Sequence, residues 1–389
     1  MREFLRPLSN EFIESWSNKH PDSLGSKLSK FVEEGELPDW ENARVALIGV
    51  QEDRRARKND GAGEGPDYVR GALYDLFFGR WSFDVVDLGN IEPGNRVDDT
   101  YFALSAVVHE LAKADCIPII IGGSQDLTFA NYKAYEKLEQ SVNICSVDAQ
   151  FDLGVNNQEL SNETYLSHII LQKPNILFNF SNIGFQTYYV HQEEIDLMES
   201  LHFERHRIGL FHHNIGEAEP ILRDADIVSF DMRSIRHSDA PANRHGSPNG
   251  WYGEEACAIA RYAGMSDKLT SFGIYEYNPQ YDRHEQTAKL GAQMIWYFLE
   301  GISVRKNDFP FGDRSSYAKY IVPNSTLDQD LHFYKSDRSG RWWIEVPLQG
   351  DPSIFHKRHA LIPCSYFDYL QAAEDEIPDR WMSAFRKLS

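Results

Sequence analysis

Three polar residues follow directly on one apolar run and could bind a cation. Residues 142–147 (VNICSV) are apolar enough for a buried strand, and Asp148, Gln150 and Asp152 come next at alternate positions. On an extended chain, side chains two residues apart point the same way, so these three would converge on one crevice at the carboxyl end of a strand. Such a crevice suits a metal ion or a cationic ligand. The alternative for the same residues is an Asx turn that only ends the strand.

The same design, an apolar run that ends in polar residues, occurs in two further segments. Residues 116–126 (CIPIIIGGSQD) end in a glycine pair, Gln125 and an aspartate, and residues 225–233 (ADIVSFDMR) end in Asp231 and Arg233. Parallel strands joined by right-handed crossovers bring their carboxyl ends to one edge of a sheet. We therefore expect these residues to line one crevice together with the segment that begins at Asp148.

These three segments resemble, in order and spacing, the metal-binding motifs of the arginase, agmatinase and formimidoylglutamase family (the ureohydrolases), which read roughly GGDHS, DAHxD and SxDxD. Residues 61–70 (GAGEGPDYVR) resemble the family's Gly-Pro-rich segment before its first helix, and residues 275–282 (YEYNPQYD) resemble its ExNPxxD motif. The resemblance implies a three-layer α/β fold, a homo-oligomer, and two divalent ions, usually manganese, held by two histidines and four aspartates. It also implies that Glu276 binds a guanidinium or amidine group.

Half of the implied metal ligands are substituted in this chain. The family's proton-transfer histidine, in the loop after DAHxD, also has no counterpart in residues 155–166. Retention of Glu276 has a structural alternative, because its carboxylate could instead pair with an arginine or a backbone N–H. The retained metal positions are Asp148, Asp152 and Asp231, and the substituted positions are Gln125 and Gln150, where the histidines would stand, and Arg233, where the fourth aspartate would stand.

Two hypotheses about function follow. In the first, the chain keeps the fold, has lost the two ions, needs no cofactor, and acts as an inactive ligand-binding or protein-interaction module. In the second, it is an active hydrolase that uses Mn²⁺ to cleave linear C–N bonds in an amidine or guanidine such as formimidoyl-glutamate, arginine or agmatine. Electrostatics favours the first, because a divalent ion 4 Å from the Arg233 guanidinium would cost about 8 kcal/mol at an effective dielectric near 20.

Apolar strands and amphipathic helices alternate between residues 43 and 302. This pattern is typical of the α/β class, with a largely parallel, about eight-stranded sheet between two layers of helices. We expect strands at residues 43–50, 82–89, 117–121, 142–147, 175–183, 207–211, 227–230 and 270–275. We expect helices at residues 66–78, 98–114, 127–138, 164–171, 193–201, 218–223, 253–262 and 283–298.

The ends of the chain depart from this alternation. Residues 1–42 are expected to form an N-terminal helical extension, with amphipathic pieces near residues 10–16 and 24–33. Residues 303–389 are rich in aromatics and proline and are expected to pack on the 43–302 domain or on a neighbouring subunit. This C-terminal extension contains one possible strand at residues 341–347 and an amphipathic helix at 379–387.

Composition restricts the class of partner. The 389 residues carry a formal net charge of −20, which argues against nucleic acid, since a duplex is met by a basic surface. No apolar run of about 18 residues and no signal-peptide h-region occurs, so we expect no membrane insertion and a cytoplasmic protein. The four cysteines lack CxxC spacing and suit buried thiols. The partner is then an unknown small molecule or protein.

Overall fold

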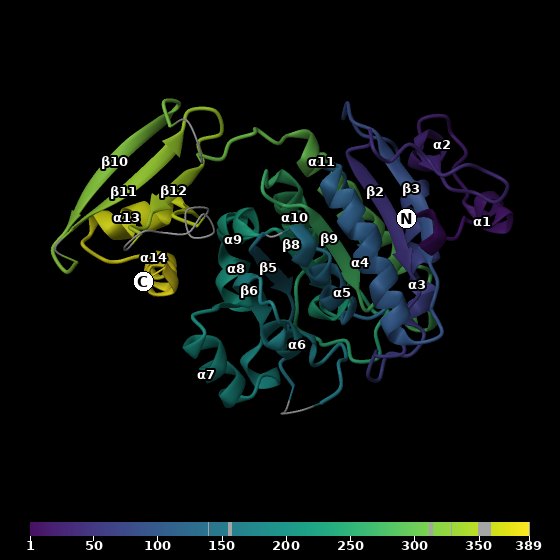
Figure 1. The fold of residues 1–389 in the computed structure, drawn as a ribbon, viewed down its shortest axis with the longest axis horizontal. Coiled ribbons are helices and arrows are strands. Elements are labelled where there is room, and N and C mark those ends of the chain that lie inside the picture. Colours follow the sequence, from purple (N-terminus) through teal and green to yellow (C-terminus); the bar gives the residue numbers. More distant parts are fainter. Residues whose placement is uncertain (139, 155–157, 311–313, 328, 349–358, 389) are drawn as a thin grey trace.

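The centre of the molecule is a nine-stranded sheet in which every neighbouring pair of strands is parallel (Figure 1). The structure, a computed structural model, describes residues 1–138, 140–154, 158–310, 314–327, 329–348 and 359–388. The strand order is β1-β3-β2-β4-β9-β8-β5-β6-β7. The strands are β1 (Ser29–Lys30), β2 (Val45–Val50), β3 (Val85–Ile91), β4 (Ile117–Ile121), β5 (Val142–Val147), β6 (Leu177–Phe185), β7 (Glu204–Arg207), β8 (Ile227–Asp231) and β9 (Ser271–Tyr275).

Helices cover both faces of the sheet, so the predicted three-layer α/β class is confirmed. Alternate residues of each central strand enter different cores: Val45 and Leu47 pack in one, Ala46 and Ile48 in the other. The first core includes α3 (Gly65–Tyr74), α9 (Ala218–Asp224), α10 (Gly253–Met265) and α11 (Gln286–Ser303). The second includes α4 (Val97–Lys113), α5 (Leu127–Lys133), α6 (Tyr165–Leu171) and α7 (Gln192–Ser200).

The prediction of a strand at residues 207–211 is wrong. The edge strand β7 ends at Arg207, and α8 (Ile208–His213) begins at the next residue. Ile208 and Phe211 both pack in the first core whereas Leu210 is 53% exposed, which is a helical spacing rather than alternation. The sequence of β7 (Glu204–Arg207, ERHR) is charged rather than apolar, which explains why the strand was expected a few residues too late.

The N-terminal region supplies the ninth strand. Its helices are short, α1 (Asn10–Ser15) and α2 (Leu24–Lys27), and β1 adds to the edge of the sheet beside β3. A two-residue strand is too short to produce an alternating pattern, which explains why the sequence did not predict it. Among the described residues, no helix is long and apolar enough to cross a membrane.

The C-terminal region forms a second sheet with four antiparallel strands, drawn in yellow-green in Figure 1. Only the strand that corresponds to β12 was predicted. Two helices, α13 (Tyr366–Ala373) and α14 (Asp379–Leu388), accompany the sheet, and we call residues 314–388 the C-terminal unit. The strands in order are β10 (Tyr317–Asn324), β11 (Gln329–Ser336), β12 (Trp342–Glu345) and β13 (Leu361–Cys364).

The C-terminal unit packs against the amino ends of the parallel strands. Arg223, at the end of α9 and just before β8, donates to the backbone oxygens of Trp342 and Cys364, each at 3.1 Å. Lys387 of α14 donates to the side chain of Asn179, near the start of β6. The unit therefore lies at the edge opposite to the carboxyl ends of the strands.

Candidate functional site

Four neighbouring strands end at the predicted crevice. They are adjacent in the order β4-β9-β8-β5, and the polar residues follow each strand or occupy its last position. All but two of the predicted site residues are at most 4% exposed, so this is a buried polar cluster in the centre of the carboxyl edge. The fully buried members are Gln125 after β4, Asp148 and Asp152 after β5, Asp231 at the end of β8, and Glu276 after β9.

The segment after β5 is a turn rather than a continuation of the strand. Asp148 Oδ1 accepts a hydrogen bond from the backbone N–H of Gln150 at 2.9 Å, and Asp152 has a left-handed φ of 53°. The two aspartates face the crevice, but the Gln150 amide instead donates to the Tyr189 backbone oxygen at 3.1 Å. The prediction that Gln150 converges with its neighbours is therefore wrong, because the turn breaks the alternation on which it depended.

Arg233 contributes the only cation to this cluster among the described residues. It belongs to a 3₁₀ turn, Met232–Ser234, that directly follows β8. Its Nε lies 2.5 Å from Asp231 Oδ2, and its backbone N–H donates to Asp231 Oδ1 at 2.6 Å. Its Nη2 lies 3.7 Å from Asp152 Oδ1. One guanidinium therefore bridges the ends of β8 and β5.

Among the described residues, the crevice buries more carboxylates than its single cation, Arg233, can neutralise. Burial, and after it the neighbouring Asp148, raises the pKa of Asp152 well above its usual value. Burial opposes the charged form of Arg233 as well, but Asp231, Asp152 and Asp148 together raise the pKa of its guanidinium. The guanidinium thus stays charged, and part of the negative charge beside it is unfavourable.

Several buried polar atoms of the crevice lack hydrogen-bond partners among the described residues. Three of them are acceptors, Gln125 Oε1, Asp148 Oδ2 and Asp152 Oδ2, and one is a donor, Arg233 Nη2. The Gln125 amide nitrogen lies within 3.4 Å of the hydroxyls of Ser146, Tyr165 and Ser229. Buried groups of this kind are normally satisfied, so the arrangement suits a bound molecule that brings N–H or O–H donors.

Glu276 acts as a brace in this structure. Its Oε1 accepts from the Gln125 backbone N–H at 2.9 Å, and its Oε2 accepts from the Asn59 side chain at 2.8 Å. Its backbone oxygen accepts from Asn243 at 3.1 Å, and its φ is 67°, in the left-handed region. Because both carboxylate oxygens have partners within the protein, Glu276 holds the ends of β4 and β9 together.

Sequence reasoning missed several residues that shape the site. Asp126 receives hydrogen bonds from the hydroxyls of Ser124 and Tyr101. Burial raises the pKa of Asp126 to about 6, although these two hydrogen bonds lower it. Two features of the sequence could have identified these residues. Asp126 lies inside the segment that resembles the GGDHS motif, and Ser146 and Ser229 are hydroxyl residues inside otherwise apolar strands.

The loop between β8 and α10 is basic where it approaches the crevice. Burial, followed by the charges of Lys58, Arg233 and Arg244, lowers the pKa of His245. His245 and Arg244 are exposed, and Arg233 keeps 11% of its side chain exposed. Cationic side chains therefore extend from the crevice toward solvent.

The donor set of the crevice differs from the one that the family resemblance implies for two manganese ions. Both oxygens of Asp231 are bound by Arg233, and the unpaired oxygens that remain belong to one glutamine and two aspartates. Manganese sites of this kind use imidazole and several carboxylates, and a divalent ion would also meet the charge of Arg233. The donor set suits polar contacts to a small molecule better than coordination of two ions.

Comparison with known proteins now gives the family. The family model described as Arginase family matches residues 43–300. The chain belongs to the arginase family. The matched residues contain the parallel strands β2 to β9 and the crevice but not the C-terminal unit.

Several of the similar proteins are formimidoylglutamases. The formimidoylglutamase of Streptococcus gordonii is 27% identical over 286 residues, which is 68% of this chain and 86% of that protein. The crystal structure of formimidoylglutamase from Bacillus subtilis subsp. subtilis has a TM-score of 0.62 at 19% identity and covers 69% of this chain and 93% of its own. A Trypanosoma cruzi formiminoglutamase with Mn²⁺ has a TM-score of 0.64 at 19% identity, over 73% and 99% of the two chains. At this identity the two structures show a shared fold.

Proposed function

We propose that this arginase-family chain is a non-catalytic binding module whose crevice takes a small molecule or protein group without a metal ion. The observation that carries the proposal is the ion pair between Arg233 and Asp231, at 2.5 Å, in the position where the family resemblance implies two aspartate ligands. A guanidinium that forms charge-assisted hydrogen bonds with clustered carboxylates neutralises them in place of a cation from solution.

The unpaired atoms support a polar ligand of limited charge. Three acceptors and one donor remain, so a molecule with two or three N–H or O–H groups and one acceptor would complete the hydrogen bonding. A buried water can occupy the same place when the ligand is absent. A divalent ion would bind the acceptors but would leave Arg233 Nη2 facing a like charge.

A second function, a metal-dependent hydrolase of linear amidines or guanidines, is favoured by two observations. Several similar proteins are named formimidoylglutamases, and several neighbouring structures of a Trypanosoma cruzi formiminoglutamase carry Mn²⁺. Asp148 and Asp152 each keep one unpaired oxygen. In that case manganese would occupy the crevice, and Arg233 would have to move away from Asp231.

The two candidates differ in their response to manganese. We expect no change in the thermal midpoint of the wild type on adding MnCl₂, because Arg233 already pairs with Asp231 and would repel the ion. The variant Gln125→His/Gln150→His/Arg233→Asp restores the family's implied ligands and should melt higher with manganese, by mass action on the folded state. Wild-type protein that melts higher with manganese, with no additional gain in the variant, would show that the native crevice binds the ion and would contradict the proposal of a metal-free site.

An activity assay gives an independent answer. We expect no formamide from formimidoyl-glutamate and no urea from arginine or agmatine, with or without manganese, because a metal-bound water would be needed. Turnover above background that disappears in Asp231→Ala would contradict the proposal. A contaminating host enzyme would survive that substitution, so the variant also serves as the control.

A further inference from the structure

The edge strand β7 borders a cleft of about 650 Å³ between the α/β domain and the C-terminal unit. The domain contributes the end of α7, which belongs to one helical layer, and α8 and α9, which belong to the other. The C-terminal unit contributes α13 and α14. The cleft therefore runs along the open edge of the parallel sheet, between its two helical layers, and its volume is within the range of protein binding sites.

The backbone of β7 is open on one side. β7 is the last strand of the nine-stranded sheet and pairs only with β6. In a parallel pair, alternate residues turn their N–H and C=O groups to the neighbouring strand, so the residues between them turn theirs away from it. Among the described residues, no other segment forms a backbone hydrogen bond with residues 204–206. An extended chain that lies in the cleft would find these groups available, as in other cases of strand addition.

The shape of this edge selects a single extended segment as the partner. β7 has only four residues, ERHR, and a short charged edge strand discourages pairing with the sheet of another folded protein. Helices of both layers and of the C-terminal unit surround the edge, so a second copy, which brings its own helices, does not fit. The charged side chains of β7 have partners within the domain: Arg205 pairs with Glu199 at 2.7 Å, and Glu204 accepts from Asn179 at 2.8 Å.

The cleft exposes large apolar side chains. Leu210 of α8 is 53% exposed and Phe367 of α13 is 58% exposed, and both line it. Apolar side chains that remain exposed on a concave surface are typical of an interaction site. Because the side chains of an extended segment alternate between two faces, every second residue of such a segment would point to the helical layer that contains Leu210.

The charges of the cleft favour a basic segment. Its lining contains five carboxylates and three arginines, which leaves a net charge of −2 with neutral histidines. Glu217 forms no ion pair with the described residues, and burial raises the pKa of its carboxyl. A cation beside Glu217 would favour its ionised form. The net charge of −20 on the whole chain attracts basic partners as well.

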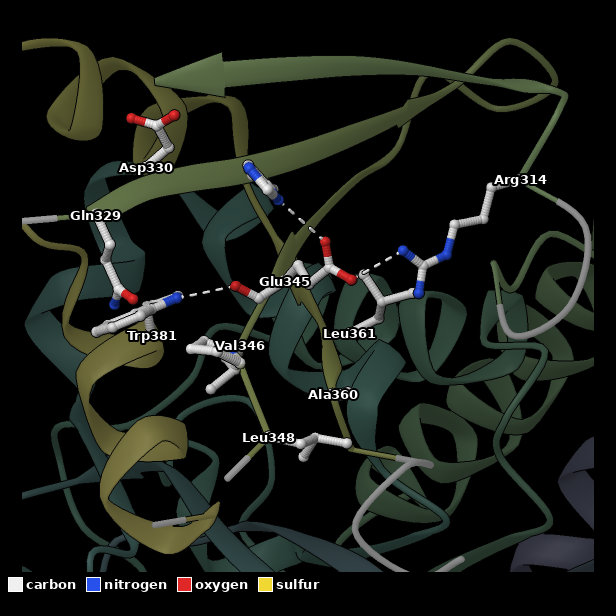
Figure 2. Close-up of a pocket in the computed structure, with 11 residues that line it drawn as sticks. Arg314, Gln329, Asp330, Glu345, Val346, Leu348, Ala360, Leu361 and Trp381 are labelled. Carbon is white, nitrogen blue, oxygen red and sulfur yellow. Dashed lines mark hydrogen bonds and ion pairs between the residues drawn. The ribbon is translucent and has the colours of Figure 1, made fainter. Parts of the chain in front are cut away.

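The side of the cleft that α14 forms is fixed before any partner binds. Figure 2 shows the Trp381 indole of α14, whose Nε1 donates to the Glu345 backbone oxygen at 2.9 Å. The same indole stacks on Phe385 with ring centres 5.0 Å apart. A preformed wall loses little conformational entropy when a peptide binds against it.

We propose that the cleft along β7 binds an extended peptide segment of a partner protein, which carries apolar and basic side chains and adds to the parallel sheet as a tenth strand. The site lies at the edge of the sheet, where β6 separates it from β5 and the crevice. It therefore holds or fails separately from the function proposed above.

The test uses acetyl-KVKVKV-amide as the probe, with titration calorimetry on the full chain. Two isomers of this peptide carry N-methyl groups on the three valines or on the three lysines. In an extended segment, the N–H groups of one set face β7 and those of the other set face away. We expect one isomer to bind about tenfold more weakly than the parent peptide, and the other to bind as the parent does. Equal affinities of the two isomers, or no binding of the parent at millimolar concentration, would overturn the proposal.

A peptide of opposite charge tests the choice of partner. Acetyl-EVEVEV-amide keeps the backbone and the valines but reverses the charge, so it should bind about tenfold more weakly than the lysine peptide. Equal or tighter binding of the glutamate peptide would reject a basic segment as the partner.

A matched pair of variants locates the binding. Phe367→Ser removes an exposed apolar side chain from the cleft and should weaken binding of the lysine peptide about tenfold. Phe102→Ser removes a phenylalanine of α4 that is 62% exposed and lies outside the cleft, and it should leave the affinity unchanged. Far-UV circular dichroism checks that both variants fold. A folded Phe367 variant with the affinity of the wild type would show that the peptide binds elsewhere and would reject the site.

Discussion

The two edges of the parallel sheet bury charge in different ways. At the amino edge, cations outnumber carboxylates around Glu219: Arg223 and Arg341 both lie 3.1 Å from this one side chain, and nearby Lys268 lies 3.0 Å from Asp224. At the carboxyl edge, Asp148, Asp152 and Asp231 share the single guanidinium of Arg233, and unpaired polar atoms remain among the described residues. The arginines of the amino edge join two parts of the chain, whereas clustered carboxylates with raised pKa values, as at the carboxyl edge, are typical of a binding site.

The largest effect should come from removing the one cation of the carboxyl edge. Arg233→Ala leaves clustered carboxylates uncompensated in a buried place and should lower the free energy of unfolding by about 3–5 kcal/mol. Urea denaturation measures the change. The matched control is Arg244→Ala, an exposed arginine of the neighbouring loop, for which we expect less than about 0.5 kcal/mol.

A double variant tests whether the loss of stability comes from the uncompensated charge of Asp231. Asp231→Asn with Arg233→Ala removes a negative charge along with its partner and should be less destabilised than the sum of the two single changes. If Arg233→Ala alone unfolds as easily as the wild type, the crevice does not depend on its internal cation, and the comparison between the edges fails.

Lowering the pH should destabilise the amino edge of the sheet, because Glu204 at the start of β7 becomes protonated there. Burial raises the pKa of this carboxyl, but the hydrogen bond and charge of His206, with Lys387 and Arg380, lower it to about 2. Because the folded-state pKa lies below the ordinary glutamate pKa of 4.5, the stabilisation is complete above about pH 4.5 and is lost as the pH falls toward 2. The shift corresponds to at most about 3 kcal/mol.

The measurement is the difference in unfolding free energy between the wild type and Glu204→Gln at pH 6, 4 and 3. We expect the advantage of the wild type to shrink as the pH falls, since the glutamine does not titrate. The corresponding change at Glu199, whose side chain is 67% exposed, should give a small and nearly constant difference. A pH-independent advantage for Glu204 would mean that its environment does not favour the ionised form.

A smaller effect is expected where the C-terminal unit joins the domain. Arg223→Met keeps most of the apolar stem but leaves the backbone oxygens of Trp342 and Cys364 without their donor, at a cost of about 2 kcal/mol. Glu219 keeps Arg341 as its partner, which limits the loss. Limited proteolysis should cut between the two parts faster in this variant, and an unchanged rate would show that Arg223 does not stabilise the joint.

The sequence predicted the parts of the fold that follow from local pattern. Apolar runs located strands β2, β4, β5, β8 and β9, and the polar residues after them met at one edge as expected. The contact between Arg233 and Asp231 follows from their position in the same strand-to-loop junction.

The remaining features depend on contacts that a single segment does not encode. Gln150 leaves the crevice because the chain turns at Asp148, whose side chain accepts from the Gln150 backbone N–H, and because the Gln150 amide finds a partner in the distant Tyr189 backbone oxygen. The partner of Glu276 is Asn59, more than 200 residues earlier in the chain, and no spacing rule connects them. In the C-terminal unit, β10 and β11 carry mixed polar and aromatic residues without a clean alternation, because the small sheet is only partly covered.

The closeness of Arg233 and Asp231 in the sequence has a consequence for the order of folding. Strand β8 lies in the middle of the sheet, between β9 and β5, and it brings Asp231 with its counter-ion two residues away. The carboxylate can therefore be neutralised before the sheet closes around it, whereas a site that depends on a captured ion must wait for that ion to arrive. We expect refolding from urea, followed by tryptophan fluorescence, to proceed at the same rate with EDTA as with manganese. Folding of this chain would then be independent of the metal supply of the cell that makes it.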